Sequence, residues 1–113
     1  MKSNVTKNLT GYQKKYLRGL AHKLKPVVMV GLKGATPALF KSVEAALMAH
    51  ELIKIRFVEP REREQKSRIT TEITTQTGCE IAGTIGHTAI LYRPHTDPDK
   101  RRIVFPRKST DHV

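Results

Sequence analysis

The sequence contains one loop whose residue types could bind a phosphate group, Gly31-Leu32-Lys33-Gly34. Because glycine has no Cβ, another molecule's backbone could approach this loop closely, and the Thr36-Pro37 pair that follows is typical of a helix start with unpaired NH groups. Lys33 adds a mobile positive charge in the same space. Two glycines at this spacing also occur in ordinary tight turns. The loop is therefore a candidate phosphate site whose surroundings must decide between the two interpretations.

Positive charge is concentrated in the part of the chain that contains this loop. The 113 residues include 21 Lys and Arg against 10 Asp and Glu, which gives a formal net charge of +11 at pH 7. Nine of the bases and none of the acids fall within residues 1–43, whereas residues 44–93 contain seven of each. Such a region attracts polyanions, of which RNA, DNA and anionic lipid surfaces are abundant in cells. A basic surface that binds no partner is the plain alternative.

The candidate contact residues are the loop and the bases that precede it. The nearest general comparison is the GXXG loop of KH domains, which grips a nucleic-acid backbone through its main chain. The chain has only three Phe and three Tyr and no aromatic RNP1-like string, so we expect affinity to come mainly from phosphates. The predicted RNA-binding residues are Lys14, Lys15, Arg18, His22, Lys25, Gly31, Leu32, Lys33 and Gly34.

Capping residues and hydrophobic periodicity predict the elements that position these residues. Thr10 and Gln13 form a capping-box pattern, and the helix that follows has an apolar stripe through Leu17, Leu20 and Leu24 opposite a cationic face that includes Arg18. We predict helices over residues 11–22, 37–50 and 61–77, an interior strand over 27–30, a half-buried strand over 52–58, and a hairpin of strands 79–85 and 89–93. Residues 103–105 could add a short strand. The order α-β-α-β-α-β-β predicts one compact α/β (α+β) domain, a mixed sheet covered by helices.

The third predicted helix carries bases that have acidic neighbours. Glu62 and Lys66, and likewise Glu64 and Arg68, stand at i, i+4, a spacing typical of ion pairs on a helix surface. The same argument covers the remaining bases of this helix. We therefore assign Arg61, Arg63, Lys66 and Arg68 no binding role.

Enzymatic chemistry has little support in the sequence. The Walker and dinucleotide-binding patterns are absent, the histidines form no HExxH motif, and the serines lack G-x-S-x-G. Cys79 has no second cysteine or obvious base beside it, and we interpret it as a small core residue. We predict no enzymatic activity, no metal site and no cofactor.

Three further features bear on location. No apolar run approaches the roughly 18 residues that a membrane helix needs, and the first residues lack the apolar core of a signal peptide. A single cysteine also suits a reducing compartment. These features predict a cytoplasmic protein with no membrane partner.

Five segments together resemble a CRM domain, the chloroplast RNA splicing and ribosome maturation domain, in the single-domain arrangement of bacterial YhbY proteins. They are Leu20-Ala21-His22, Lys25-Pro26-Val27-Val28, the glycine loop, residues 50–54 and residues 85–93. The resemblance covers about residues 9–94 and leaves 95–113 as a basic, flexible tail. It implies a four-stranded sheet backed by helices, related to the C-terminal domain of translation initiation factor three, and RNA binding through the glycine loop. This chain has His87 where the family's hairpin commonly carries a lysine.

Charge and resemblance together predict a monomeric, non-catalytic RNA-binding protein. The resemblance implies a ribosome assembly factor that acts on precursor large-subunit ribosomal RNA in pre-ribosomal particles. Two alternatives stay open, a structural constituent of the mature ribosome and a non-catalytic subunit of an RNA-processing enzyme. The sequence identifies neither the exact RNA target nor the assembly step.

Overall fold

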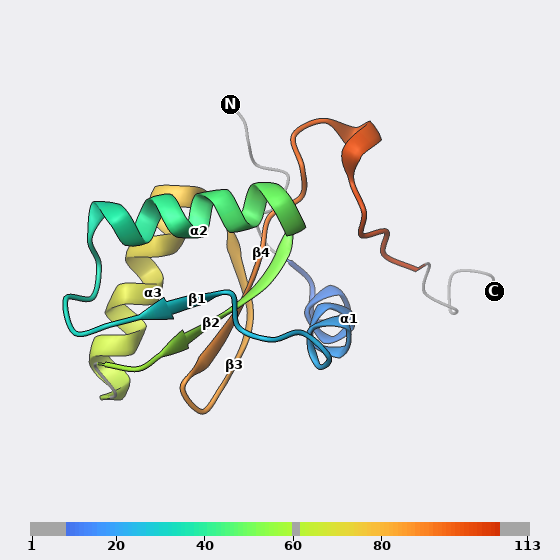
Figure 1. Cartoon of the computed structure of the whole chain (residues 1–113). Helices are drawn as coiled ribbons and strands as arrows, with labels where there is room; N and C mark the ends of the chain where they lie inside the picture. Colours follow the sequence, from blue (N-terminus) through green and yellow to red (C-terminus); the bar gives the residue numbers. More distant parts are fainter. Residues whose placement is uncertain (1–8, 60–61, 107–113) are drawn as a thin grey trace.

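The computed structural model describes residues 9–59 and 62–106, which form three helices and four strands in the predicted order (Figure 1). A short 3-10 helix follows the last strand. The elements are α1 (Gly11–Ala21), β1 (Val28–Val30), α2 (Pro37–His50), β2 (Leu52–Phe57), α3 (Arg63–Thr77), β3 (Glu80–Ile85), β4 (Thr88–Tyr92) and the 3-10 helix Pro98–Lys100. The expected α+β domain is confirmed.

The helix boundaries follow from the predicted capping residues. At the start of α1 the Thr10 hydroxyl accepts from the Gln13 amide and the Gln13 side chain accepts from the Thr10 amide, both at 3.0 Å. Thr36 caps α2 by accepting from the Leu39 amide at 3.1 Å. Gly78 ends α3 with φ +74°, a left-handed conformation that glycine adopts without a steric penalty.

The strands form one mixed sheet in the order β1-β2-β4-β3. β1 runs parallel to β2, and the other pairs are antiparallel. The prediction that residues 27–30 form an interior strand is wrong, because β1 lies at the sheet edge. Val28 and Val30 face the core, whereas Val27 and Met29 lie on the other side and are 51% and 56% exposed.

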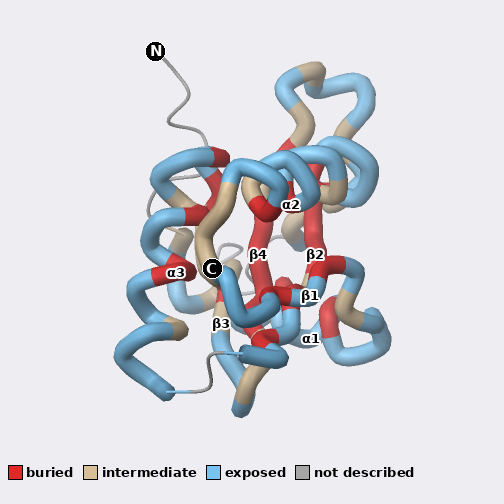
Figure 2. Tube along the Cα trace, turned by 60° about the vertical axis from the view of Figure 1, so that its left-hand side comes forward, coloured by how far each residue is buried: buried red, intermediate tan, exposed pale blue. Residues whose placement is uncertain are grey.

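The two faces of the sheet carry two apolar cores (Figure 2). The larger core lies under α2 and α3 and includes Val43, Ile55 and Leu91, all fully buried. Cys79 belongs to this core, as predicted, and burial raises the pKa of its thiol. α1 packs on the other face through Leu17, whereas Leu20 and Leu24 of the predicted stripe are each 39% exposed.

The end of α2 is joined to the segment after β4 by one buried carboxylate. Glu51, 2% exposed, has φ +65° and accepts from the amides of His95, Arg102 and Ile103 at 2.7, 2.8 and 3.1 Å. These bonds hold residues 95–103 against the domain. The short strand suggested for residues 103–105 does not form, and the Ile103 amide bonds to the Glu51 side chain instead of to a neighbouring strand.

The C-terminal segment also completes the core under α1. The Phe105 ring lies 5.7 Å from the Tyr16 ring and 5.8 Å from the Tyr92 ring. Tyr12 donates from its hydroxyl to the Pro106 carbonyl at 2.8 Å. Residues 107–113 lie outside the described part of the chain, so the flexibility of the tail and its boundary at residue 94 stay predictions.

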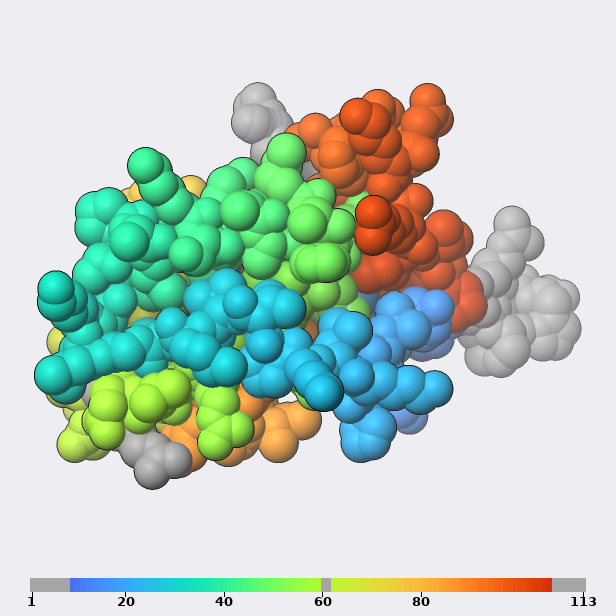
Figure 3. All heavy atoms as spheres, in the orientation of Figure 1, coloured from blue at the N-terminus to red at the C-terminus, as the bar shows by residue number. Residues whose placement is uncertain are grey.

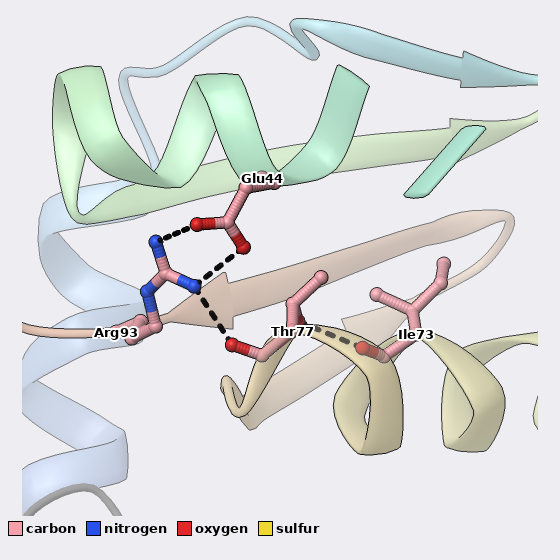
Figure 4. Close-up of polar contacts among 4 residues, drawn as sticks. All are labelled: Glu44, Ile73, Thr77 and Arg93. Carbon is pink, nitrogen blue, oxygen red and sulfur yellow. Dashed lines mark hydrogen bonds and ion pairs between the residues drawn. The ribbon is translucent and has the colours of Figure 1, made fainter. Parts of the chain in front are cut away.

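Arg93 fastens the end of β4 to both helices of the larger core (Figure 4). Its guanidinium donates to the two carboxylate oxygens of Glu44 at 2.7 and 2.9 Å and to the Thr77 carbonyl at 2.7 Å. The hydrogen bonds from Arg93 lower the pKa of the Glu44 carboxyl below its ordinary value.

Among the described residues, no helix has the length and apolar character of a membrane span.

Candidate nucleic-acid interface

The glycine loop is an exposed turn between β1 and α2. The Gly34 amide donates to the Gly31 carbonyl at 3.0 Å, which closes a four-residue turn. Leu32 at its tip is 83% exposed, and Lys33 is also exposed. The turn therefore presents a positive charge and the main chain to solvent together.

The two glycines of this turn differ in what the fold requires of them. Gly34 has φ +65°, and a Cβ added there would lie 3.2 Å from Cδ1 of Ile69 in α3. Gly31 has no positive φ, and an added Cβ would meet nothing within 4 Å. The fold needs a glycine at position 34, whereas at position 31 the absent side chain leaves open space for a ligand.

A shallow hollow of about 510 Å³ adjoins the loop. It lies between β1 and the first turns of α2, and its lining includes Met29, Leu32, Lys33, Ala38 and Ser42. None of the described residues that line it is acidic. Because β1 is an edge strand, one row of its backbone groups has no strand partner on this side. The hollow therefore combines backbone polar groups with one cation, Lys33, and both can bind a phosphate.

The start of α2 offers fewer free amides than the sequence predicts. Pro37 has no NH, the Leu39 amide is donated to the Thr36 hydroxyl, and the Phe40 amide is donated to the Thr36 carbonyl at 3.1 Å. Ala38 keeps the remaining amide of the first turn. A phosphate at this helix start would therefore depend on Ala38, the loop amides and Lys33 more than on a fan of helix amides.

The predicted bases of the first helix lie away from the loop, at the other end of β1 (Figure 1). Helix α1 therefore does not flank the loop. Figure 3 shows α1, β1 and the loop, blue to cyan, as one band across this face of the molecule. In the segment that forms this band, Lys15, His22 and Lys25 are exposed and Lys14 is half-buried. The arrangement suits an extended polyanion better than a single small ligand.

The helical wheel predicts that Arg18 points away from the core. In the structure its side chain instead contacts β3. Its guanidinium donates to the Ala82 carbonyl at 3.0 Å, and its Cδ lies 2.7 Å from where a Cβ on Gly83 would stand. Gly83 leaves the room in β3 that this side chain occupies. Arg18 thus helps to hold α1 on the sheet, and its contact with RNA stays a prediction, as it does for the other eight predicted site residues.

The two ion pairs predicted on α3, Glu62 with Lys66 and Glu64 with Arg68, are both absent from the described part of the chain. Lys66 forms no ion pair with Glu62, because within the described residues the structure contains one salt bridge, between Glu44 and Arg93. The Lys66 ammonium instead donates to the Gly86 carbonyl at 3.1 Å and lies 2.9 Å from Nδ1 of His87. Its charge is therefore at the hairpin. Sequence spacing cannot indicate these contacts, because Gly86 and His87 lie 20 and 21 positions after Lys66 in the chain.

Comparison with known proteins shows the family. The model of the CRS1/YhbY (CRM) domain matches residues 9–93, which is most of the chain. The chain belongs to the CRM domain family. The solution structure of a Staphylococcus aureus protein has the same fold as this CRM domain, with a TM-score of 0.72, 28% identity and coverage of 86% of this chain and 100% of that one.

Curated relatives of this CRM protein are named for RNA binding. A Haemophilus influenzae protein named RNA-binding protein is 43% identical over 100 residues, which cover 88% of this chain and 97% of the relative. The Bacillus subtilis protein named Probable RNA-binding protein YqeI is 36% identical over 85 residues, 75% of this chain and 88% of the relative. Both names describe binding and neither describes catalysis.

Proposed function

We propose that this CRM protein is a non-catalytic RNA-binding protein that grips the sugar-phosphate backbone with its glycine loop. The observation that carries the proposal is the exposed Gly31–Gly34 turn, with Lys33 beside a hollow that has no acidic lining. The described residues 9–43 contain no acid, and their bases extend the positive charge along the band toward α1. The names of the relatives support RNA as the polyanion.

We further propose that the RNA is precursor large-subunit ribosomal RNA and that the protein acts in ribosome assembly. Support comes from family membership and from the exposed basic turn, since contacts to phosphates would suit a large folded RNA better than a short sequence motif. A structural constituent of the mature ribosome would use the same surface, as would a non-catalytic subunit of an RNA-processing enzyme.

Fractionation of ribosomal particles from cells that express the tagged full-length protein tests this proposal. We expect the protein in precursor large-subunit fractions and its absence from mature ribosomes, and we expect crosslinked RNA to map to the large-subunit precursor. Stoichiometric retention in mature ribosomes would favour a structural constituent. Crosslinks that map only to other RNA classes would contradict a role in ribosome assembly while leaving RNA binding intact.

A further inference from the structure

A second hollow, outside the glycine loop, lies between α3 and the hairpin of β3 and β4. Its volume is about 440 Å³, and one wall comes from the first half of α3 while the other comes from the hairpin. The lining residues are Phe57, Arg63, Lys66, Ser67, Thr70, Thr71, Ile81, Thr84, Gly86, Thr88 and Ala89. Two of them are bases and none is an acid.

Among the described residues, no carboxylate pairs with the positive charge of this pocket. An ammonium group can only donate, so Nδ1 of His87 accepts from Lys66, and both contacts of Lys66 at the hairpin are to uncharged groups. Arg63 is exposed, and among the described residues neither base lies within salt-bridge distance of a carboxylate. A pocket with two uncompensated cations favours an anionic ligand.

The rest of the lining has both polar and apolar groups. The hydroxyls of Ser67, Thr84 and Thr88 make no hydrogen bond within the described part of the chain, so they can donate to a ligand. The hydroxyls of Thr70 and Thr71 instead donate to backbone carbonyls of α3 at 2.7 and 3.0 Å. Phe57, Ile81 and Ala89 supply apolar surface. Cations beside free hydroxyls and an apolar floor match the phosphate, sugar and base of a nucleotide.

We propose that this pocket binds one phosphate-bearing nucleotide of the same RNA, as a contact separate from the glycine loop. The proposal rests on the RNA-binding function proposed above. Arg63 and Lys66 pair with the phosphate, and the free hydroxyls bond to the sugar or the base edge. α3 connects the two sites, because Ile69 lies under Gly34 while Lys66 and Thr70 line the pocket. A single RNA strand or fold can therefore contact both sides of this helix.

Charge-removing variants of the full-length protein test the pocket. Arg63→Met removes a lining cation whose side chain makes no hydrogen bond to another described residue. Arg68→Met removes an exposed cation of the same helix that lies outside the pocket. Lys66→Met removes the second lining cation, and Lys66→Arg restores it. RNA affinity is measured by fluorescence anisotropy over a range of salt concentrations, after circular dichroism has shown that each variant folds.

We expect Arg63→Met and Lys66→Met each to weaken RNA binding about three- to tenfold and to reduce the salt dependence by about one counterion. Arg68→Met should stay within about twofold of the parent, and Lys66→Arg should retain most of the affinity. The pocket proposal would be overturned if both pocket variants bound RNA as tightly as Arg68→Met does. If Lys33→Ala still weakened binding in that case, the proposed function would stand. Failure of the unmodified protein to bind any RNA would overturn both.

An NMR titration with uridine monophosphate separates the two sources of a nucleotide. Shifts of the Thr84, Gly86 and Thr88 amides that vanish in Arg63→Met support the pocket, provided that the same variant also loses RNA affinity. The same shifts with unchanged RNA affinity would identify a site for free nucleotides and would overturn the RNA contact.

Discussion

Lys33 stands at the exposed tip of a turn, where its ammonium group can contact a phosphate without touching a base. Lys33→Ala should therefore weaken binding to different RNA sequences by similar factors. The slope of log affinity against log salt should fall in magnitude by about 0.7 to 0.9, the value for one phosphate contact. Anisotropy titrations with two unrelated RNAs at several salt concentrations measure both quantities. A changed ranking of the two RNAs would indicate base recognition and contradict this role.

The two loop glycines should separate stability from binding. Gly34→Ala places a side chain at φ +65° and against Ile69, so we expect a loss of about 1 kcal/mol in the free energy of unfolding. Gly31→Val meets open space, so stability should stay within about 0.5 kcal/mol of the parent. RNA affinity should nevertheless fall in Gly31→Val, because the side chain obstructs a ligand. Chemical denaturation and anisotropy provide the two measurements, and unchanged affinity would make the loop purely architectural.

Glu51 is the residue on which the C-terminal segment depends. Glu51→Gln keeps the shape of the side chain but removes the negative charge that accepts hydrogen bonds from three backbone amides. The NH2 group of glutamine also cannot accept a hydrogen bond, so at least one of these amides loses its partner. We expect a loss of about 2 kcal/mol in the free energy of unfolding. Glu59→Gln, at an exposed glutamate, is the matched control and should change it by less than about 0.5 kcal/mol. Equal effects of the two variants in urea denaturation would contradict the claim that Glu51 holds the C-terminal segment against the domain.

At the scale of elements, the Glu44–Arg93 contact predicts a pH-dependent link between α2 and β4. Because Arg93 lowers the pKa of Glu44 in the folded state, its contribution is present above the unfolded pKa and is lost as pH falls through the folded pKa. Glu44→Gln should cost about 0.5 to 1 kcal/mol at neutral pH, a modest value because the glutamate side chain is half exposed. Denaturation of both proteins at pH 7 and near pH 3 should show the difference shrinking in acid. A constant difference would contradict the charge-based link.

Element boundaries could be predicted from the sequence because local groups determine them. Thr10, Thr36 and Gly78 act on amides or carbonyls within a few residues, so their effect is written in the adjacent sequence. The position of β1 in the sheet could not be predicted in this way. The side of β1 that faces away from the core also carries apolar residues, Val27 and Met29. The sequence of this edge strand is therefore as apolar as that of a central strand, and the two cannot be told apart.

At the scale of the whole molecule, the loop could be predicted and its relation to the rest of the site could not. Gly31, Lys33 and Gly34 are neighbours in the chain. The distance from α1 to the loop instead depends on how β1 lies along the edge of the sheet. Contacts over long separations were also missed, including those of Glu51 with backbone amides 44 to 52 positions away. Lys66 is another example. Helical spacing predicts Glu62 as its partner, whereas in the structure its ammonium contacts Gly86 and His87 of the hairpin.

The most direct measurement of the central idea is an NMR titration of the isotope-labelled full-length protein with a fragment of precursor large-subunit RNA. We predict that the largest amide shifts occur at residues 31–34 and at Ala38, with further shifts along β1 and the exposed bases of α1. Largest shifts on the outer surface of α2, with the amides of the glycine loop unmoved, would contradict the claim that this loop grips the RNA backbone.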